Sequence, residues 1–176
     1  MAWEFDVLNW IQEHIRNGFL DTIFPWITFL GNGGWFWIVL TLVGFIPKTT
    51  RKYAFISAFA LICCLVLGNL ILKPGIARIR PFDIQTGIQL LIEKPHDYSF
   101  PSGHTQASFA TATAIFFRDK RWGAGALVLA GLIAFSRMYL FVHYPTDILA
   151  GVLFGVVYAF IGKLIVEAIY KKKGLA

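Results

Sequence analysis

Charge and cysteine are both scarce in this chain. Only 15% of its 176 residues are charged and two are cysteines, whereas 57% are hydrophobic and 16% are aromatic. A soluble domain is about 45–50% apolar, so this composition favours a protein whose solvent is the lipid bilayer. Because a hydrocarbon core of about 30 Å takes roughly 20 apolar residues per helix, the chain has room for about five or six spans.

The two cysteines, Cys63 and Cys64, are adjacent in an apolar run. Neighbouring side chains on a helix point in different directions and do not form a disulfide of ordinary geometry. We interpret both as packing residues, and they give no information about the redox compartment.

Linkers, low-complexity tracts and internal repeats are also missing. The basic region, apolar run and small-residue cleavage site of a signal peptide are missing as well. We therefore expect residues 1–176 to form a single integral-membrane domain whose N-terminus stays on the mature protein.

The expected fold is all-α, a polytopic membrane bundle of about six transmembrane helices. The amphipathic segment 3–16 is too polar to span and is predicted to lie in the membrane interface. The first predicted span is only about 18 Å long as a helix, so it would cross by tilting, by thinning the bilayer or by continuing from the segment before it. A short interfacial helix is predicted around 86–92, in the loop after the third span. The six predicted spans are 19–30, 35–46, 53–72, 104–117, 123–142 and 145–170.

Polar residues of three distant stretches fall at the same ends of these spans. Lys73 ends the third span, His104 begins the fourth, Arg137 lies in the last two turns of the fifth, and Asp147 opens the sixth. Since consecutive spans alternate in direction, all of these residues are predicted to meet at one membrane face.

Basic clusters mark the opposite face. The net charge is +6, but the basic residues form short clusters at span ends instead of one stripe, which argues against nucleic acid as a partner. By the positive-inside rule the clustered face is cytoplasmic, so the polar site is predicted to face the outside of the cytoplasmic membrane. The clusters are Lys48, Arg51 and Lys52, then Arg118, Lys120 and Arg121, then Lys171, Lys172 and Lys173.

The tetrapeptide 101–104 has the composition of an anion site. Ser102 is placed to cap a helix start, Gly103 allows close approach, and the free N–H groups of a helix N-terminus attract anions. His104 would then lie beside the bound anion. Taken alone, the tetrapeptide is more often a serine-capped helix with an incidental histidine.

A histidine and a carboxylate follow on the last two segments. Pro145 restarts a helix, so Asp147 lies in its first turn and can reach back to His143, holding Nδ1–H and leaving Nε2 free to attack phosphorus. A purely structural pair or a helix cap is the alternative for these residues in isolation.

Three cations complete the set. Lys73, Arg80 and Arg137 can each be explained as snorkelling interface residues, but a charge at the membrane boundary of the fifth span calls for a partner, and a phosphate suits a planar guanidinium. Arg78 is assigned equally to headgroup contact or to solvent.

Together, Lys-x6-Arg-Pro, Pro-Ser-Gly-His and Ser-Arg-x5-His-x3-Asp, in that order, resemble the three-part signature of the type 2 phosphatidic acid phosphatase superfamily. Every signature position is filled between Lys73 and Asp147. The resemblance implies a phosphatase in which His143 forms a phosphohistidine, Asp147 orients it, and His104 protonates the leaving oxygen. It also implies that Lys73, Arg80, Ser102, Gly103 and Arg137 bind the phosphoryl oxygens, with no metal and no cofactor.

The family acts on several lipid phosphates, and the signature does not separate them. We rank undecaprenyl diphosphate first and phosphatidylglycerophosphate second, with phosphatidic acid also open, and expect segment 81–101 to fold over the site and contribute to the choice. The bilayer is the expected environment. The alternatives are a lipid phosphotransferase with the same intermediate, a vanadate-dependent haloperoxidase, which the apolar spans disfavour, and a non-catalytic lipid-binding or transport protein.

Overall fold

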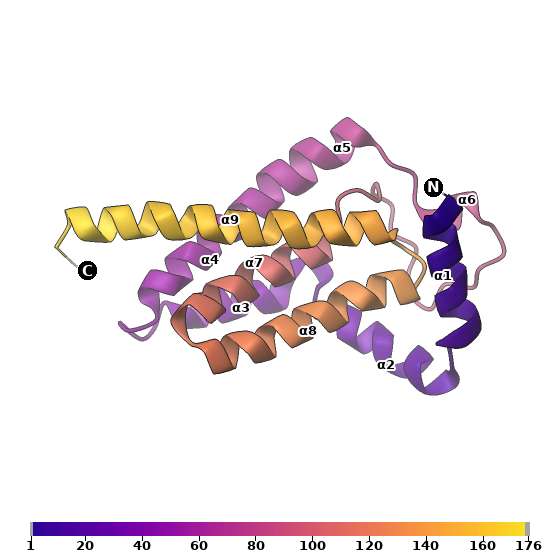
Figure 1. The fold of residues 1–176 in the computed structure, drawn as a ribbon, viewed down its shortest axis with the longest axis horizontal. Helices are drawn as coiled ribbons and strands as arrows, with labels where there is room; N and C mark the ends of the chain where they lie inside the picture. The colour runs from indigo at the N-terminus through magenta and orange to yellow at the C-terminus, as the bar shows by residue number, and fades with distance from the viewer. Residues whose placement is uncertain (1, 175–176) are drawn as a thin grey trace.

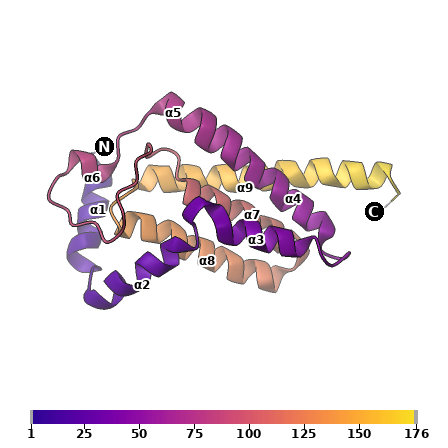
Figure 2. The same ribbon diagram turned by 180° about the vertical axis from the view of Figure 1, so that it is seen from behind.

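The computed structural model describes residues 2–174, and within them every regular element is helical. Figures 1 and 2 show an elongated bundle in which α1 and α6 lie at one end and the C-terminal end of α9 lies at the other. In chain order the elements are α1 (Ala2–His14), α2 (Gly18–Phe29), η1 (Asn32–Gly34), α3 (Trp35–Gly44), α4 (Arg51–Cys63), η2 (Cys64–Leu72), α5 (Lys73–Ile76), α6 (Pro81–Ile84), α7 (Gly103–Arg118), α8 (Lys120–Tyr139) and α9 (Pro145–Lys172).

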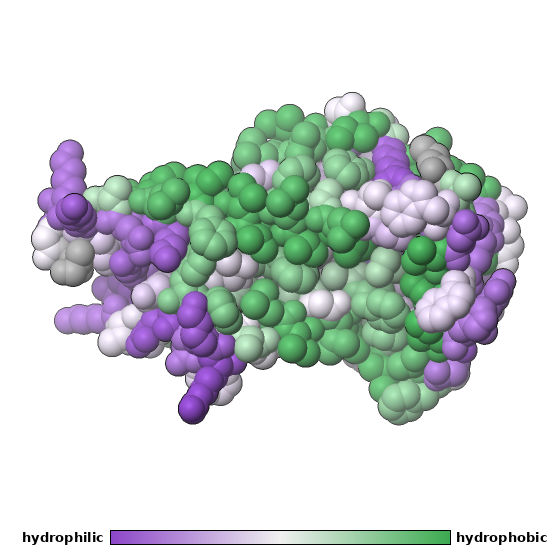
Figure 3. Space-filling model, in the orientation of Figure 1, coloured by the Kyte–Doolittle hydropathy of each residue, from purple (hydrophilic) through white to green (hydrophobic). Residues whose placement is uncertain are grey.

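The bundle carries an apolar belt. Figure 3 shows hydrophobic residues over the middle of the molecule and hydrophilic residues at both ends. Large apolar side chains are exposed there, which would be costly in water but suits lipid. They include Leu42, Ile62, Leu70, Leu149, Leu153 and Leu164. The belt fits the predicted polytopic membrane bundle.

Six helical segments lie where the six spans were predicted, with boundaries that differ by a few residues. By length and apolarity alone, three helices of the described chain can cross a membrane, beginning at Arg51, Lys120 and Pro145. The pair formed by α2 with η1 and α3 is a fourth candidate, bent by 42°. The bend follows from Gly33 and Gly34, whose φ angles of 58° and 70° glycine adopts without steric cost. Six full crossings therefore stay a prediction.

The centre of the bundle is α7, which packs against α4, α8 and α9. Its buried positions are mostly Ala, Ser and Thr, and such small residues let membrane helices approach closely. At Gly155 of α9, a Cβ atom would lie 2.5 Å from the carbonyl oxygen of Gln106. This close approach lies in the third turn of α9, and at the start of the helices the Ser102 N–H donates to the carbonyl oxygen of Asp147 at 3.3 Å. The first turns of α7 and α9, which carry His104 and Asp147, therefore lie at the same end of the bundle.

The amphipathic N-terminal segment forms α1, which packs its apolar face, including Leu8 and Ile11, against α8 and α9. The short helix after the third span is present, but the predicted position around 86–92 was wrong. It lies at Pro81–Ile84, where proline favours the first helical turn. Residues 86–92 are irregular because Ile88, Leu90, Leu91 and Ile92 pack individually on the α1 and α8 core and need no helix to be covered.

Candidate active site

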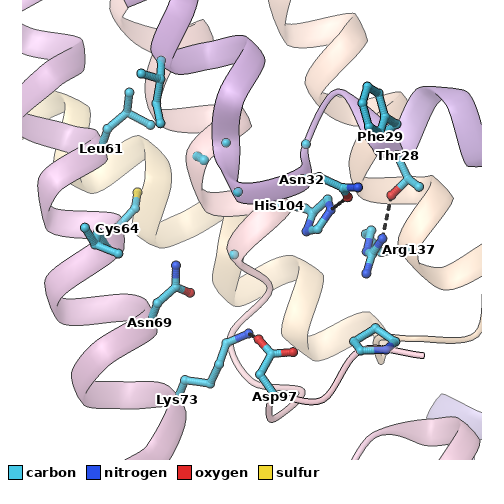
Figure 4. A pocket seen from close by; sticks show the side chains of 18 of the residues that line it. Thr28, Phe29, Asn32, Leu61, Cys64, Asn69, Lys73, Asp97, His104 and Arg137 are labelled. Carbon is cyan, nitrogen blue, oxygen red and sulfur yellow. Dashed lines mark hydrogen bonds and ion pairs between the residues drawn. The ribbon is translucent and has the colours of Figure 1, made fainter. Parts of the chain in front are cut away.

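The three sequence stretches surround one cavity of about 1020 Å³, seen from close by in Figure 4. Asp147 and Ser102 are fully buried behind its wall. The other six predicted site residues line the cavity directly: Lys73, Arg80, Gly103, His104, Arg137 and His143.

A tight turn after α8 places His143 next to Arg137. Phe141 has a positive φ of 60°, which reverses the chain at the end of the helix. The backbone N–H of His143 then donates to the carbonyl oxygen of Arg137 at 3.3 Å. Pro145 starts α9 two residues later, so the imidazole and the guanidinium share one wall of the cavity.

The His143 imidazole is held on both sides. Its Nδ1 lies 3.4 Å from Oδ2 of Asp147, an oxygen that also accepts from the Tyr144 N–H at 2.9 Å and from the Ser99 hydroxyl at 2.5 Å. Its Nε2 lies 3.2 Å from Nη1 of Arg80. With the ring proton on Nδ1, Nε2 presents a lone pair toward the cavity and the guanidinium.

Burial and the nearby positive charges of Arg80, Arg137 and Lys73 hold the pKa of His143 well below its ordinary value. The imidazole is therefore neutral near pH 7, and a neutral Nε2 is the form that can attack phosphorus.

Asp97 bridges the two cations of the first stretch. Lys73 Nζ lies 2.5 Å from one carboxylate oxygen of Asp97, and Arg80 Nη2 lies 2.6 Å from the other. Burial raises the pKa of this carboxyl, but the hydrogen bond and charge of Lys73, with those of Arg80, outweigh burial and bring the pKa well below its usual range. Asp97 thus offers these cations the two-oxygen contact that a phosphoryl group would offer.

Arg137 has few partners for a buried charge. Its side chain is 2% exposed, Nη1 donates to the Thr28 hydroxyl at 2.6 Å, and Nε has no hydrogen-bond partner among the described residues. Since an underpaired guanidinium in an apolar setting is costly, an anion in the cavity would be a favourable partner. Figure 4 shows Arg137 and His104 extending toward the same space.

The residues at the start of α7 differ in their contacts. His104 Nε2 is 2.8 Å from Oδ1 of Asn32. Gly103 lines the cavity, so the cavity wall includes the backbone of the N-terminus of α7. Helix N-termini are sites where anions bind. The Ser102 hydroxyl accepts from the N–H and the hydroxyl of Thr105 inside the bundle and does not line the cavity. Its contacts are therefore those of a helix cap.

Away from the polar end, the cavity is walled by α3 and by α4 with its η2 extension. Leu61 and Cys64 of this wall are labelled in Figure 4. Its apolar lining includes Ile38, Leu42, Phe45, Leu61, Ile62 and Leu65. One cavity thus joins a cationic end to an apolar trough.

The assignment of Arg78 to headgroup contact or solvent was wrong. Its side chain is only 15% exposed, with Nη1 2.5 Å from Oδ1 of Asp147 and Nη2 2.7 Å from Oε2 of Glu4. A basic residue two positions from Arg80 gives no sequence signal for this pairing, because its partners are 69 and 74 residues away.

Asp97, Ser99 and Asn69 were also missed by sequence reasoning. Asn69 lines the cavity one turn before Lys73, and its Oδ1 is buried without a partner in the described residues. An amide inside an apolar membrane helix is a detectable signal. Asp97 and Ser99 lie in an irregular loop without periodicity and give none. Among residues 2–174, no three His, Cys, Asp or Glu side chains converge as metal ligands, and metal independence stays a prediction.

Comparison with known proteins places this site in a family. The family model described as PAP2 superfamily matches residues 49–171. An undecaprenyl-diphosphatase of Sulfolobus acidocaldarius is 32% identical over 154 residues, covering 86% of this chain and 71% of that protein. The crystal structure of Aquifex aeolicus LpxE has a TM-score of 0.82 at 28% identity, over 92% of this chain and 95% of that one.

A second solved structure, the first transmembrane PAP2 type phosphatidylglycerolphosphate phosphatase from Bacillus subtilis, has a TM-score of 0.70 at 28% identity, over 88% of this chain and 80% of that one. The matched region contains all three stretches of the site, and the chain is a helical membrane phosphatase that belongs to the PAP2 superfamily.

Proposed function

We propose that this phosphatase removes phosphate from a lipid diphosphate, with undecaprenyl diphosphate favoured, through a phosphohistidine on His143. One observation carries the proposal. The same cavity has a cationic end with His143 and an apolar trough between α3 and α4, so a phosphate and a long hydrocarbon tail can be bound together. The likeness to the undecaprenyl-diphosphatase supports the substrate ranking.

In the first step, the Nε2 lone pair of His143 forms a bond to phosphorus while the bond from phosphorus to the leaving oxygen breaks. His104 donates a proton to that oxygen, and Asp147 stabilises the charge that develops on the imidazole. In the second step, His104 takes a proton from water, the water oxygen bonds to phosphorus, and the P–N bond breaks to release inorganic phosphate and neutral His143.

Positive charge stabilises both steps. Lys73, Arg80 and Arg137 surround the place where the phosphoryl oxygens would lie, and phosphoryl transfer depends mainly on such electrostatic stabilisation. In this account the phosphate replaces Asp97 as the partner of Lys73 and Arg80, and it supplies the anion that the Arg137 guanidinium lacks.

Phosphatidylglycerophosphate is the second candidate substrate, because the Bacillus subtilis phosphatase resembles this chain in fold. Residues 92–97 line the polar end of the cavity and are placed to contribute to the choice between headgroups.

We further propose that the site faces the outside of the cytoplasmic membrane. The basic clusters lie in the turn from α3 to α4, the turn from α7 to α8, and the end of α9, all at the end of the bundle opposite α1. The positive-inside rule places that end in the cytoplasm.

The test replaces His143 by Ala and measures phosphate release in detergent from undecaprenyl diphosphate, phosphatidylglycerophosphate and phosphatidic acid. Loss of the nucleophile should lower release at least about 1,000-fold on every substrate that the parent protein cleaves. The matched control is His14→Ala, a histidine exposed on α1. Release by His143→Ala equal to that of the control would contradict the mechanism, and a preference for phosphatidylglycerophosphate would reverse the substrate ranking.

A further inference from the structure

A buried chain of charges connects the N-terminal helix to the catalytic pair. Glu4 of α1 is 3% exposed, and its carboxylate lies 2.7 Å from Nη2 of Arg78. Nη1 of the same guanidinium lies 2.5 Å from Oδ1 of Asp147. Glu4 and Asp147 are therefore joined through one arginine, although they lie in the first and the last helix of the described chain.

Both terminal nitrogens of Arg78 are bound by protein groups. Besides the two carboxylates, Nη1 donates to the Thr146 hydroxyl at 2.7 Å, and the guanidinium stacks on the Tyr144 ring at 3.9 Å from its centroid. Neither Glu4 nor Arg78 lines the cavity. Glu4 and Arg78 are therefore not placed to contact the substrate directly.

The guanidinium selects which oxygen of Asp147 faces His143. Oδ1 is held by Arg78, and this leaves Oδ2 for the contact with Nδ1 of His143 at 3.4 Å. An aspartate without this contact could rotate, because its remaining partners, Ser99 and the Tyr144 N–H, both bind the single oxygen Oδ2.

Glu4 supplies the balancing charge. Burial raises the pKa of Glu4, but hydrogen bonds from Thr146 and Arg78 and the charge of Arg78 outweigh it and lower the pKa, so the group is ionised near pH 7. Two carboxylates then share one guanidinium. Because Glu4 offsets the charge of Arg78, Asp147 keeps the net negative charge that stabilises an imidazolium.

We propose that Glu4 and Arg78 are positioning residues, through which α1 holds Asp147 in the orientation that activates His143. The inference rests on the proposed function of His143 and Asp147. It assigns a role in catalysis to the N-terminal amphipathic helix, which docks on the bundle through Leu8 and Ile11.

The experiment measures kcat, KM and thermal stability of Glu4→Gln, Arg78→Gln and the double variant. Each single variant should lower kcat about 10- to 100-fold, the usual effect of misplacing a catalytic group, and KM should stay within about twofold because the cavity is unchanged. The matched control, Asp6→Asn, removes an exposed carboxylate from the same helix and should leave kcat unchanged.

The double variant separates positioning from stability. Arg78→Gln leaves two buried carboxylates, Glu4 and Asp147, without a cation, whereas the double variant leaves only Asp147 without one and should recover part of the thermal stability that Arg78→Gln loses. Positioning predicts that its kcat nevertheless stays low, because Asp147 has lost Arg78. Recovery of kcat together with stability, or single variants that match Asp6→Asn, would overturn the proposal.

Activity is measured on whichever lipid phosphate the parent protein cleaves, so an incorrect substrate ranking does not affect the result. The proposed function is tested separately, by the activity of His143→Ala. If that variant keeps its activity, the mechanism is wrong, whereas a low activity of His143→Ala with a normal activity of Glu4→Gln overturns only the inference about α1.

Discussion

At the scale of single residues, the proposed phosphate site is a set of cations around one end of the cavity. Asp97 is the residue that occupies two of these cations, Lys73 and Arg80, in the described structure. Its side chain is 55% exposed, so its attraction to them is moderated by solvent. A phosphate that enters the cavity must compete with this carboxylate.

Replacing Asp97 by Asn should strengthen inhibition by inorganic phosphate, since the competing charge is removed. The expected decrease in the inhibition constant is about two- to fivefold, which is the scale of a partly exposed ion pair. Because the pKa of Asp97 is lowered, the carboxyl stays ionised at and above pH 5, and the difference from the parent protein should persist from pH 5 to 8.

The control for this comparison is Asp6→Asn. Asp6 is exposed on α1 and does not line the cavity. If Asp97→Asn weakened phosphate inhibition or left it equal to that of Asp6→Asn, competition between Asp97 and phosphate would be refuted.

At the scale of helices, the contact between α7 and α9 bears on the spacing of the two histidines that we propose to be catalytic. The first turn of α7 carries His104, and the first turn of α9 carries Asp147, which contacts His143. Gly155 lets the two helices touch, because a side chain there would meet the backbone of α7 at Gln106 and at Ala110.

Gly155→Ala should therefore lower both stability and activity. The added methyl group forces the helices apart, at a cost of about 1–3 kcal/mol for overpacking. Gly131→Ala on α8 is the matched control, because a Cβ atom there meets nothing within 4 Å, and it should leave stability unchanged or raise it by up to about 1 kcal/mol. Thermal unfolding in detergent measures both variants. Equal stability of the two would show that the close approach is not required.

At the scale of the whole molecule, the sequence was sufficient to predict the helical bundle and the meeting of three stretches at one end. Both rest on strong periodic signals, namely long apolar runs and polar residues at their ends. The position of α6 could not be predicted, because the apolar residues 88–92 pack without regular structure.

The contact between Glu4 and Arg78 could not be predicted from the sequence either. Glu4 lies in an amphipathic helix whose polar residues are expected to face water or headgroups, and only the docking of α1 buries it against Arg78. The contact joins residues 74 positions apart. Periodicity describes one element at a time, whereas this pairing depends on how two elements pack.

The most direct test of the central claim is to identify the phosphorylated residue. The enzyme is mixed with lipid diphosphate, quenched within one turnover at alkaline pH, where phosphohistidine is stable, and mapped by mass spectrometry. The account predicts acid-labile phosphate on His143 alone, and none in His143→Ala. Phosphate on another residue, or turnover by the parent protein through a route that never phosphorylates His143, would contradict it.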